Sequence, residues 1–386
     1  MKAETLLDSI NRLQSFMVSS RYLGYDPYDA LTSPLFRLPL LRSWHLPRFV
    51  VQQTVRRSPV NIRPILRIRP RLNPVTLGLA LQGRAELLRA SVGDAEEHRK
   101  EITSLLSSLQ SVVSQGYSGA CWGYDFDWEG RHVRIPAYVP TIVATGIITN
   151  GLFVLHGADK SQVALDLCKS ATRFILNDLH RTQIRDFFCW SYSPNDHTAV
   201  FNATLKGARQ LAQVYSVTGD ESLFRVAHQT VEFVLSEQRE NGTWGYAYRD
   251  GRTWVDHYHT GYVLDCLSEY SLLTGDDSVE AALQRGYQAY RNLLFTPAGV
   301  PKYFSNSLYP IDATSCGQAI LTLCRFGDIA EALLVADWTI ANLQRRDGAF
   351  GYQVRKRFRI MTPFMRWSNA WMYAGLATLV AALVRR

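Results

Sequence analysis

One short stretch of the chain concentrates ionisable and aromatic side chains where a helix is expected to begin. The stretch TWVDHYHTGYVLDCL, residues 253–267, holds Asp256, His257, Tyr258 and His259 ahead of an apolar continuation. Asp256 and His259 are three residues apart and would share one face of a helix. A carboxylate beside an imidazole fixes one tautomer and raises its basicity, which suits general acid–base chemistry. The structural alternative is that Asp256 only caps the helix and that the histidines are hydrogen-bonded core residues.

Similar polar groups precede four other predicted helices, and together they form the candidate site. The candidates for catalysis are Asp127, Asp256, His259 and Asp312. The candidates for binding a substrate are Trp122, Tyr124, Trp128, Trp190, Trp244, Tyr246, His257, Tyr258, Tyr309, Arg366 and Trp367. Aromatic rings suit the faces of sugars, and a guanidinium suits an anionic group. Helix capping, turn formation and packing between helices are the structural alternatives for these residues.

A repeated aromatic cluster predicts the elements that would position these side chains. It occurs as CWGY at 121–124, CWSY at 189–192, TWGY at 243–246, AFGY at 349–352 and, more weakly, PKYF at 301–304. Successive clusters lie 48 to 68 residues apart, and two helical segments joined by turns such as VTGDES lie between them. This period predicts helical hairpins that bury their faces on their neighbours. We expect an all-α (α/α)6 toroid of six hairpins over residues 73–386, with an open superhelical array as the alternative.

Residues 1–72 are expected to form an N-terminal helix and an extended basic arm packed on this body. Between Asp29 and Glu86 there are ten arginines and no acid, so the net charge of +8 is concentrated there. Such an arm suits an anionic membrane face or membrane-associated assembly partners. Its arginines alternate with Pro, Ile and Leu, so no nucleic acid is expected. The alternative is a structural arm whose arginines pair with surface acids.

Composition and cysteine usage indicate a globular protein. The 386 residues are 47% hydrophobic and 12% aromatic, and no signal peptide is recognised. The apolar run WMYAGLATLVAALV is short for a membrane span and predicts a core helix. Six scattered cysteines without CxxC spacing predict neither a metal site nor a disulfide framework, and no cofactor is expected. These features favour a cytoplasmic protein, with a peripheral position at the inner membrane as an option.

Six segments distributed over nearly the whole chain carry a family resemblance: GYDPYDAL, SPVNIRPIL, CWGYDFDW, WVDHYHTGYVLDCL, YPIDATS and MRWSNAWM. In them the chain resembles a family found in surface-polysaccharide biosynthesis gene clusters. That family is similar to six-hairpin toroid proteins, which include glycoside hydrolases, polysaccharide lyases and uronyl epimerases, and this implies a carbohydrate ligand. The chain departs from the family pattern at Phe201 and Ala313, where the family has His, and at Asp125, where it has Pro. If either lost His did chemistry, this member has shifted its reaction or kept only binding.

Together, these observations predict an enzyme that cleaves or remodels an oligo- or polysaccharide, with an acidic glycan favoured. The favoured reaction is that of a glycoside hydrolase with two carboxylates, roughly 5 Å apart for retention or roughly 6.5–9.5 Å for inversion, drawn from Asp127, Asp256 and Asp312. A uronyl lyase or C5-epimerase would instead use His259 or the tyrosine before it as base, and Arg366 to neutralise the substrate carboxylate. A non-catalytic glycan-binding subunit of a polysaccharide assembly complex and, less favoured, a terpenoid cyclase remain as alternatives.

Overall fold

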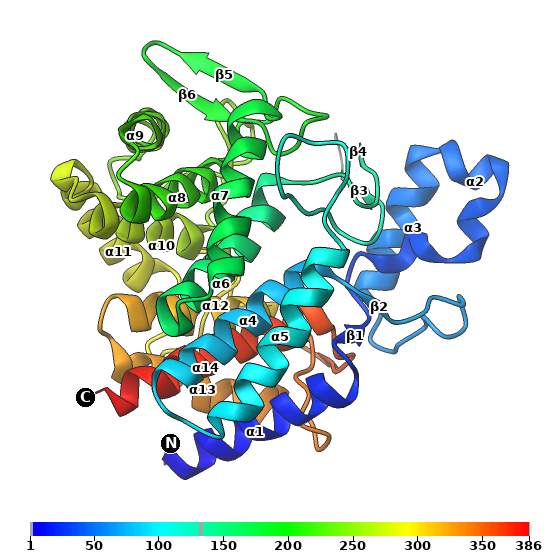
Figure 1. Ribbon diagram of the computed structural model, residues 1–386. Helices are drawn as coiled ribbons and strands as arrows, with labels where there is room; N and C mark the ends of the chain where they lie inside the picture. The colour runs from blue at the N-terminus through cyan, green and yellow to red at the C-terminus, as the bar shows by residue number, and fades with distance from the viewer. Residues whose placement is uncertain (1–2, 131–133, 386) are drawn as a thin grey trace.

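Six helices surround a central axis in the computed structural model, which describes residues 3–130 and 134–385 (Figure 1). These inner helices are α4 (Pro74–Arg89), α6 (Ile142–Asp159), α8 (Phe201–Thr218), α10 (His257–Thr274), α12 (Ala313–Arg325) and α14 (Trp371–Val384). Each inner helix packs on the next, and α14 packs on α4, so the ring is closed. The predicted (α/α)6 toroid is therefore confirmed, and the open array is excluded.

Six outer helices cover this ring. Five of them follow their inner partners in sequence: α5 (Ala95–Ser111), α7 (Gln162–Asn177), α9 (Glu221–Ser236), α11 (Glu280–Leu293) and α13 (Ile329–Leu343). The sixth is the N-terminal helix α1 (Ala3–Ser19), which packs on α14 and α13. Arg12 donates to the carbonyl of Arg345 at 2.8 Å, and the Tyr373 hydroxyl donates to Gln14 at 3.1 Å. The two ends of the chain thus form the last hairpin, which the repeat pattern did not predict.

Short turns join the inner and outer helices, and their sequences explain where the helices stop. Gly219 and Gly275 end α8 and α10 in the left-handed conformation, with φ of 69° and 72°. A glycine pays no Cβ penalty there. Asp220 then accepts a hydrogen bond from the backbone N–H of Ser222 and caps α9, and Asp276 caps the short helix η3 (Asp277–Val279) before α11. Aspartates of these turns thus cap the helices that follow them.

Two segments of the inner ring are long and apolar enough to cross a membrane by length and composition. They are residues 142–159 in α6 and 365–384 in α14 with the preceding π-helix η4 (Met365–Ala370), and 67% and 78% of these segments are buried. Both pack on other inner helices. Their apolarity therefore follows from their place in the core, as predicted for the run WMYAGLATLVAALV.

The aromatic clusters lie in the loops that lead from each outer helix to the next inner helix. In the four clusters after the first, the backbone carbonyl of a tyrosine accepts a hydrogen bond from the first residue of the inner helix one hairpin earlier in the chain. These bonds run from Ile142 to Tyr192 at 3.0 Å, from Phe201 to Tyr246 at 3.3 Å, from His257 to Tyr303 at 3.0 Å and from Ala313 to Tyr352 at 3.0 Å. The indole N–H groups of Trp122 and Trp244 donate to carbonyls near the ends of α5 and α9, Leu109 at 3.1 Å and Val234 at 2.9 Å. The backbone of the cluster ties adjacent hairpins together, and in Trp122 and Trp244 the indole bonds the loop to the outer helix that precedes it.

Short strands and the arm complete the fold. The strand pairs are β1 (Leu23–Gly24) with β2 (Arg71–Leu72), β3 (Trp128–Glu129) with β4 (Arg134–Ile135), β5 (Arg181–Ile184) with β6 (Phe187–Trp190), and β7 (Ile311–Asp312) with β8 (Gln353–Val354) and β9 (Arg359–Ile360). Between β1 and β2 the arm forms η1 (Asp29–Thr32), η2 (Pro34–Arg37), α2 (Pro39–Ser43) and α3 (His45–Arg57). In Figure 1, α2 and α3 project from one side of the ring.

Candidate functional site

The N-terminal ends of the inner helices meet the aromatic loops at one end of the toroid, and we call this end the rim. Asp256 and Asp312 are the N-caps of α10 and α12, and each accepts a hydrogen bond from a backbone N–H of its own helix. Both carboxylates interact electrostatically with the buried Tyr303, as do Arg56 and Tyr28 of the arm. The rim therefore brings together two predicted acids and two arm residues.

The most distinctive pair at the rim is Asp256 with His259. The Oδ2 atom of Asp256 lies 2.7 Å from Nδ1 of His259, and its Oδ1 atom accepts from the His259 backbone N–H at 3.2 Å. The carboxylate is 2% exposed, whereas the imidazole keeps 23% of its surface. The buried carboxylate fixes Nδ1 as the protonated nitrogen and leaves Nε2 for exchange with a ligand.

Aromatic rings enclose this imidazole on several sides. The centroid of the His259 ring lies 4.3 Å from that of Tyr258, 5.1 Å from that of Tyr246 and 6.1 Å from that of Trp254. Tyr258 in turn meets Trp367 edge-on at 5.7 Å. This arrangement places aromatic ring faces beside the Nε2 atom of His259.

Asp312 is fully buried and its oxygens are already bonded. Oδ2 accepts from Gln353 at 2.6 Å, and Oδ1 accepts from the backbone of Thr314 at 2.8 Å and from the Trp367 indole at 3.2 Å. Burial raises the pKa of Asp312. The carboxylate therefore holds β8 and the residues before α14 against α12, and it presents no free oxygen to solvent.

Asp127 lies with the arm instead of on the ring axis. Its Oδ2 atom accepts from Arg48 at 2.7 Å and its Oδ1 from the Ala137 backbone at 2.9 Å. Burial raises the pKa of Asp127, but the bonds from Ala137 and Arg48 outweigh it and the net pKa is lowered. Arg48 also binds the buried Glu129 at 2.6 Å. The three charges fasten α3 to β3.

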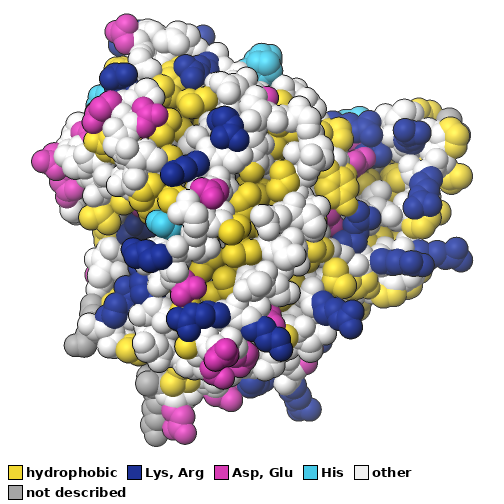
Figure 2. All heavy atoms as spheres, viewed as in Figure 1, with side chains coloured by type: hydrophobic (Ala, Val, Ile, Leu, Met, Phe, Trp, Pro, Cys, Tyr) yellow, Lys and Arg dark blue, Asp and Glu magenta, His cyan; other side chains and the backbone are white. Residues whose placement is uncertain are grey.

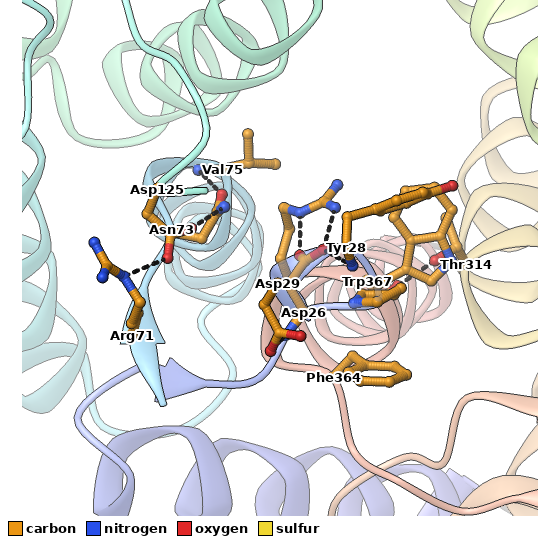
Figure 3. Close-up of polar contacts among 12 residues, drawn as sticks. Asp26, Tyr28, Asp29, Arg71, Asn73, Val75, Asp125, Thr314, Phe364 and Trp367 are labelled. Carbon is orange, nitrogen blue, oxygen red and sulfur yellow. Dashed lines mark hydrogen bonds and ion pairs between the residues drawn. The ribbon is translucent and has the colours of Figure 1, made fainter. Parts of the chain in front are cut away.

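Arg366 is already bound to a carboxylate of the chain itself. Its Nε and Nη2 atoms donate to the two oxygens of Asp26 at 2.6 and 2.9 Å, and both side chains are buried. Its guanidinium also lies 4.9 Å from the ring centroids of Tyr124 and Trp367. Figure 3 shows Asp26 and Tyr28 on the arm segment that lies against Trp367.

Several predicted binding residues do not reach the rim surface. Trp122, Trp190 and Trp244 are buried as wedges between hairpins. His257 is buried against Tyr290 with ring centroids 4.8 Å apart, and burial lowers its pKa to about 3. The partly exposed members of the predicted set are Tyr124, Asp127, Trp128, Tyr246, His259 and Tyr309.

The arm contributes rim residues that sequence reasoning missed. Arg56 donates to the Tyr352 hydroxyl at 3.0 Å and lies over the Tyr28 ring at 4.7 Å, with no carboxylate within ion-pair distance in the described chain. Arg355 lies nearby, and burial, together with Arg57 and Arg56, lowers its pKa. Both arginines lie outside the segments GYDPYDAL and SPVNIRPIL, and nothing in the sequence of the arm indicated which of its arginines turns inward.

The rim is closely filled in this structure. The space beside His259, bounded by residues that include Tyr246 and Trp254, measures about 10 Å³. A sugar can enter only if arm or loop side chains move. Within the described residues, 3–130 and 134–385, no group of three or more His, Cys, Asp or Glu is placed to hold a metal ion.

The chain matches no protein-family model. None of the curated proteins matches it either. Solved structures do share its fold. A cellobiose 2-epimerase from Bacillus thermoamylovorans is 11% identical, with a TM-score of 0.64, over 82% of this chain and 88% of that one. A family 76 α-mannanase from Bacteroides thetaiotaomicron is 12% identical, with a TM-score of 0.61, over 81% and 86%.

A third similar structure covers the whole molecule. A family 88 glycosyl hydrolase from Bacteroides vulgatus is 11% identical, with a TM-score of 0.61, over 100% of this chain and 99% of that chain. These similarities place the chain in the class of (α/α)6 toroids.

Proposed function

We propose that the chain is a carbohydrate-active enzyme that moves a proton on an anionic sugar, as an epimerase or a lyase does. The observation that carries this proposal is the Asp256–His259 pair, in which a buried carboxylate orients a partly exposed imidazole at 2.7 Å. An imidazole held in this way can take a proton from carbon and return it, or pass it on. The aromatic rings beside it supply the apolar surface for a sugar.

The cations of the rim support an anionic substrate. Arg56 and Arg355 lie near each other and near Tyr352, and no ion pair with an acid is formed by either within the described residues. Like charges held together are stabilised when an anion lies between them. A uronate carboxylate bound there would make the proton on the adjacent carbon more acidic, which lowers the barrier for its abstraction.

Hydrolysis by two carboxylates has less support. Asp312 is buried with its oxygens bonded, and Asp127 is bound to Arg48. A terpenoid cyclase would need a dry aromatic cavity. The cavity of about 520 Å³ inside the ring of inner helices instead has many charged and amide side chains in its lining. The names of the structures that share the fold, a sugar epimerase and two glycosidases, support a saccharide as the ligand.

The test is incubation with uronate-containing oligosaccharides in deuterated water. Products are analysed for deuterium at C5, for unsaturated uronate absorbance and for new reducing ends. We expect deuterium or unsaturation in the wild type, and a loss of roughly 100-fold or more in rate for His259→Gln. His228→Gln is the matched control, because His228 also pairs with an aspartate, Asp276 at 2.9 Å, but far from the rim on an outer helix.

The outcomes separate the candidate functions. New reducing ends without deuterium or unsaturation would favour the hydrolase. Binding of the oligosaccharide without any of the three products would favour a glycan-binding subunit of an assembly complex. Equal activity of wild type and His259→Gln would refute the proposal.

We further propose that the arm docks the protein on an anionic membrane surface, where surface glycans are assembled. Several large apolar side chains of the arm are strongly exposed: Leu35, Leu38, Trp44, Leu46, Val50, Val60 and Ile65. Exposed arginines lie among them, and Arg37, Arg67, Arg69 and Arg71 line a hollow of about 550 Å³. Figure 2 shows basic and hydrophobic side chains side by side on the projecting part. Apolar side chains that can insert, together with arginines for lipid phosphates, suit an anionic bilayer.

Co-sedimentation with vesicles tests the docking surface. We expect binding to vesicles of phosphatidylcholine with phosphatidylglycerol, weaker binding at high salt, and none to phosphatidylcholine alone. The double change Trp44→Ser and Leu46→Ser should reduce binding, whereas Val163→Ser, an exposed apolar residue on α7, should not. Equal sedimentation with both kinds of vesicle would contradict the proposal. Such docking supports a cytoplasmic protein peripheral to the inner membrane.

A further inference from the structure

The toroid has a second opening, at the C-terminal ends of the inner helices and opposite the rim. A cavity of about 520 Å³ extends inward from it along the ring axis, and we call it the axial well. Its deepest layer contains one residue from each inner helix: Leu79, Ile147, Lys206, Tyr262, Gln318 and Trp371. A volume of this size is typical of a small-molecule site.

Aromatic packing closes the floor of the well. The rings of Tyr262 and Trp371 stack with centroids 5.3 Å apart. The ammonium nitrogen of Lys206 lies 3.9 Å from the Tyr262 ring centroid. Tyr262 also meets the His259 ring edge-on at 6.0 Å, so a single layer of packed side chains separates the well from the Asp256–His259 pair.

The charges nearer the mouth of the well are paired with each other. Glu86 binds Arg89 at 2.5 Å and Arg385 at 3.0 Å. Glu269, behind the wall, binds Arg325 at 3.0 Å. These arginines lie at the C-terminal ends of the inner helices, where the helix dipoles favour cations. Paired acids therefore offset most, but not all, of the positive charge at the mouth, because Glu86 faces two arginines.

Of the deeper cations, Lys206 lacks such a partner and Arg209 has only a distant one. Lys206 is 2% exposed, and it forms no hydrogen bond or ion pair with any residue of 3–130 or 134–385. Arg209, one turn further along α8, is also buried. It donates to the carbonyl of Gly146, its nearest carboxylate is Glu269 at 3.9 Å, and its Nε has no partner. Burial lowers the pKa of Lys206 to about 8, as expected for an ammonium without an anion.

We propose that the axial well binds a small ligand of monosaccharide size whose carboxylate or phosphate contacts Lys206 and Arg209. Amide side chains beside these cations, Gln82, Asn150 and Gln318, can hydrogen-bond hydroxyl groups of the ligand. The lining carries five cations and two acids: Arg89, Lys206, Arg209, Arg325 and Arg385 against Glu86 and Asp265. Because Lys206 and Arg209 are the deepest cations and have no carboxylate at hydrogen-bond distance, the anionic end of the ligand enters first.

Calorimetric titration with four probes tests the site: glucuronate, glucose 6-phosphate, inorganic phosphate and glucose. We expect at least one anion to bind and the neutral sugar not to bind. Tighter binding of glucuronate or of the phosphates distinguishes a carboxylate from a phosphate ligand. Lys206→Met should weaken binding roughly 10- to 100-fold, the effect of losing one charge-assisted hydrogen bond. Lys100→Met on the exposed face of α5 is the matched control.

A second measurement does not depend on the folding of a variant. Pyridoxal phosphate carries an aldehyde and a phosphate, and it forms an imine with a deprotonated lysine amine with loss of water. After reduction with added borohydride, peptide mapping should find Lys206 labelled ahead of the exposed lysines and protected by the best probe. Preferential labelling of surface lysines, or no binding of any anion to the wild type, would overturn the proposal.

Discussion

The ion pair between Asp26 and Arg366 should be the strongest single attachment of the arm to the ring. Both side chains are about 6% exposed, and two charge-assisted hydrogen bonds join them at 2.6 and 2.9 Å. Breaking a buried pair by removing one partner typically costs about 3–5 kcal/mol, because the other charge stays buried and unpaired. We expect Arg366→Met to lie in that range. Asp26→Asn should cost about 3 kcal/mol, because the amide oxygen can still accept one bond.

Urea unfolding followed by circular dichroism measures both changes. The double variant should be less destabilised than the sum of the single variants by about 2 kcal/mol or more, since it leaves no lone charge. Limited proteolysis of residues 20–72 should be faster in each single variant than in the wild type. Additive single effects, or single effects below about 1 kcal/mol, would refute the claim that this pair holds the arm on the rim.

Three further predictions concern individual charges. Burial and then Asp26 raise the pKa of Asp125 to about 6, so the folded state binds this proton before the unfolded chain as pH falls. The unfolding free energy of the wild type minus that of Asp125→Asn should thus rise by roughly 2–3 kcal/mol from pH 7 to pH 4, and a flat difference would contradict it. The pKa of Lys206 is lowered from 10.5 to about 8 in the folded state. The unfolding free energy of the protein therefore falls as pH falls through this range. In urea titrations, the unfolding free energy of Lys206→Met minus that of the wild type should be roughly 3 kcal/mol larger at pH 7 than at pH 10.5. Asp127→Asn should lower the urea midpoint but change kcat less than about twofold. A large loss of kcat with an unchanged midpoint would instead support the hypothesis of a hydrolase with paired carboxylates.

The architecture could be predicted from the sequence because local signals repeat. Gly–Asp turns end one helix and begin the next, and the aromatic clusters recur at hairpin spacing. The last hairpin could not be predicted in this way, because α1 and α14 lie at opposite ends of the chain. A local sequence pattern does not indicate a contact between such distant segments. Only the closure of the ring shows that a sixth outer helix is needed.

The site was less predictable because residue type does not reveal the direction of a side chain. Arg56 and Arg57 are neighbours in sequence, yet Arg56 bonds to Tyr352 at the rim and Arg57 is exposed. Arg366 looked free in the sequence, but its partner Asp26 is 340 positions away. Tryptophans in aromatic loops suggested sugar platforms, whereas Trp122 and Trp244 are buried with their indole N–H groups bonded to carbonyls.

A comparison of the repeats supports α10 as the helix that would carry the proposed reaction. Equivalent N-cap positions of the inner helices are Asn73, Thr141, Val200, Asp256 and Asp312. Three residues later stand Thr76, Ala144, Ala203, His259 and Ser315. Capping explains Asn, Thr or Asp at the first position, but it requires nothing titratable at the second, and Val200 shows that even the cap can be absent. A histidine bonded to its cap occurs on α10 alone among these five helices, so a structural role common to the hairpins cannot account for it.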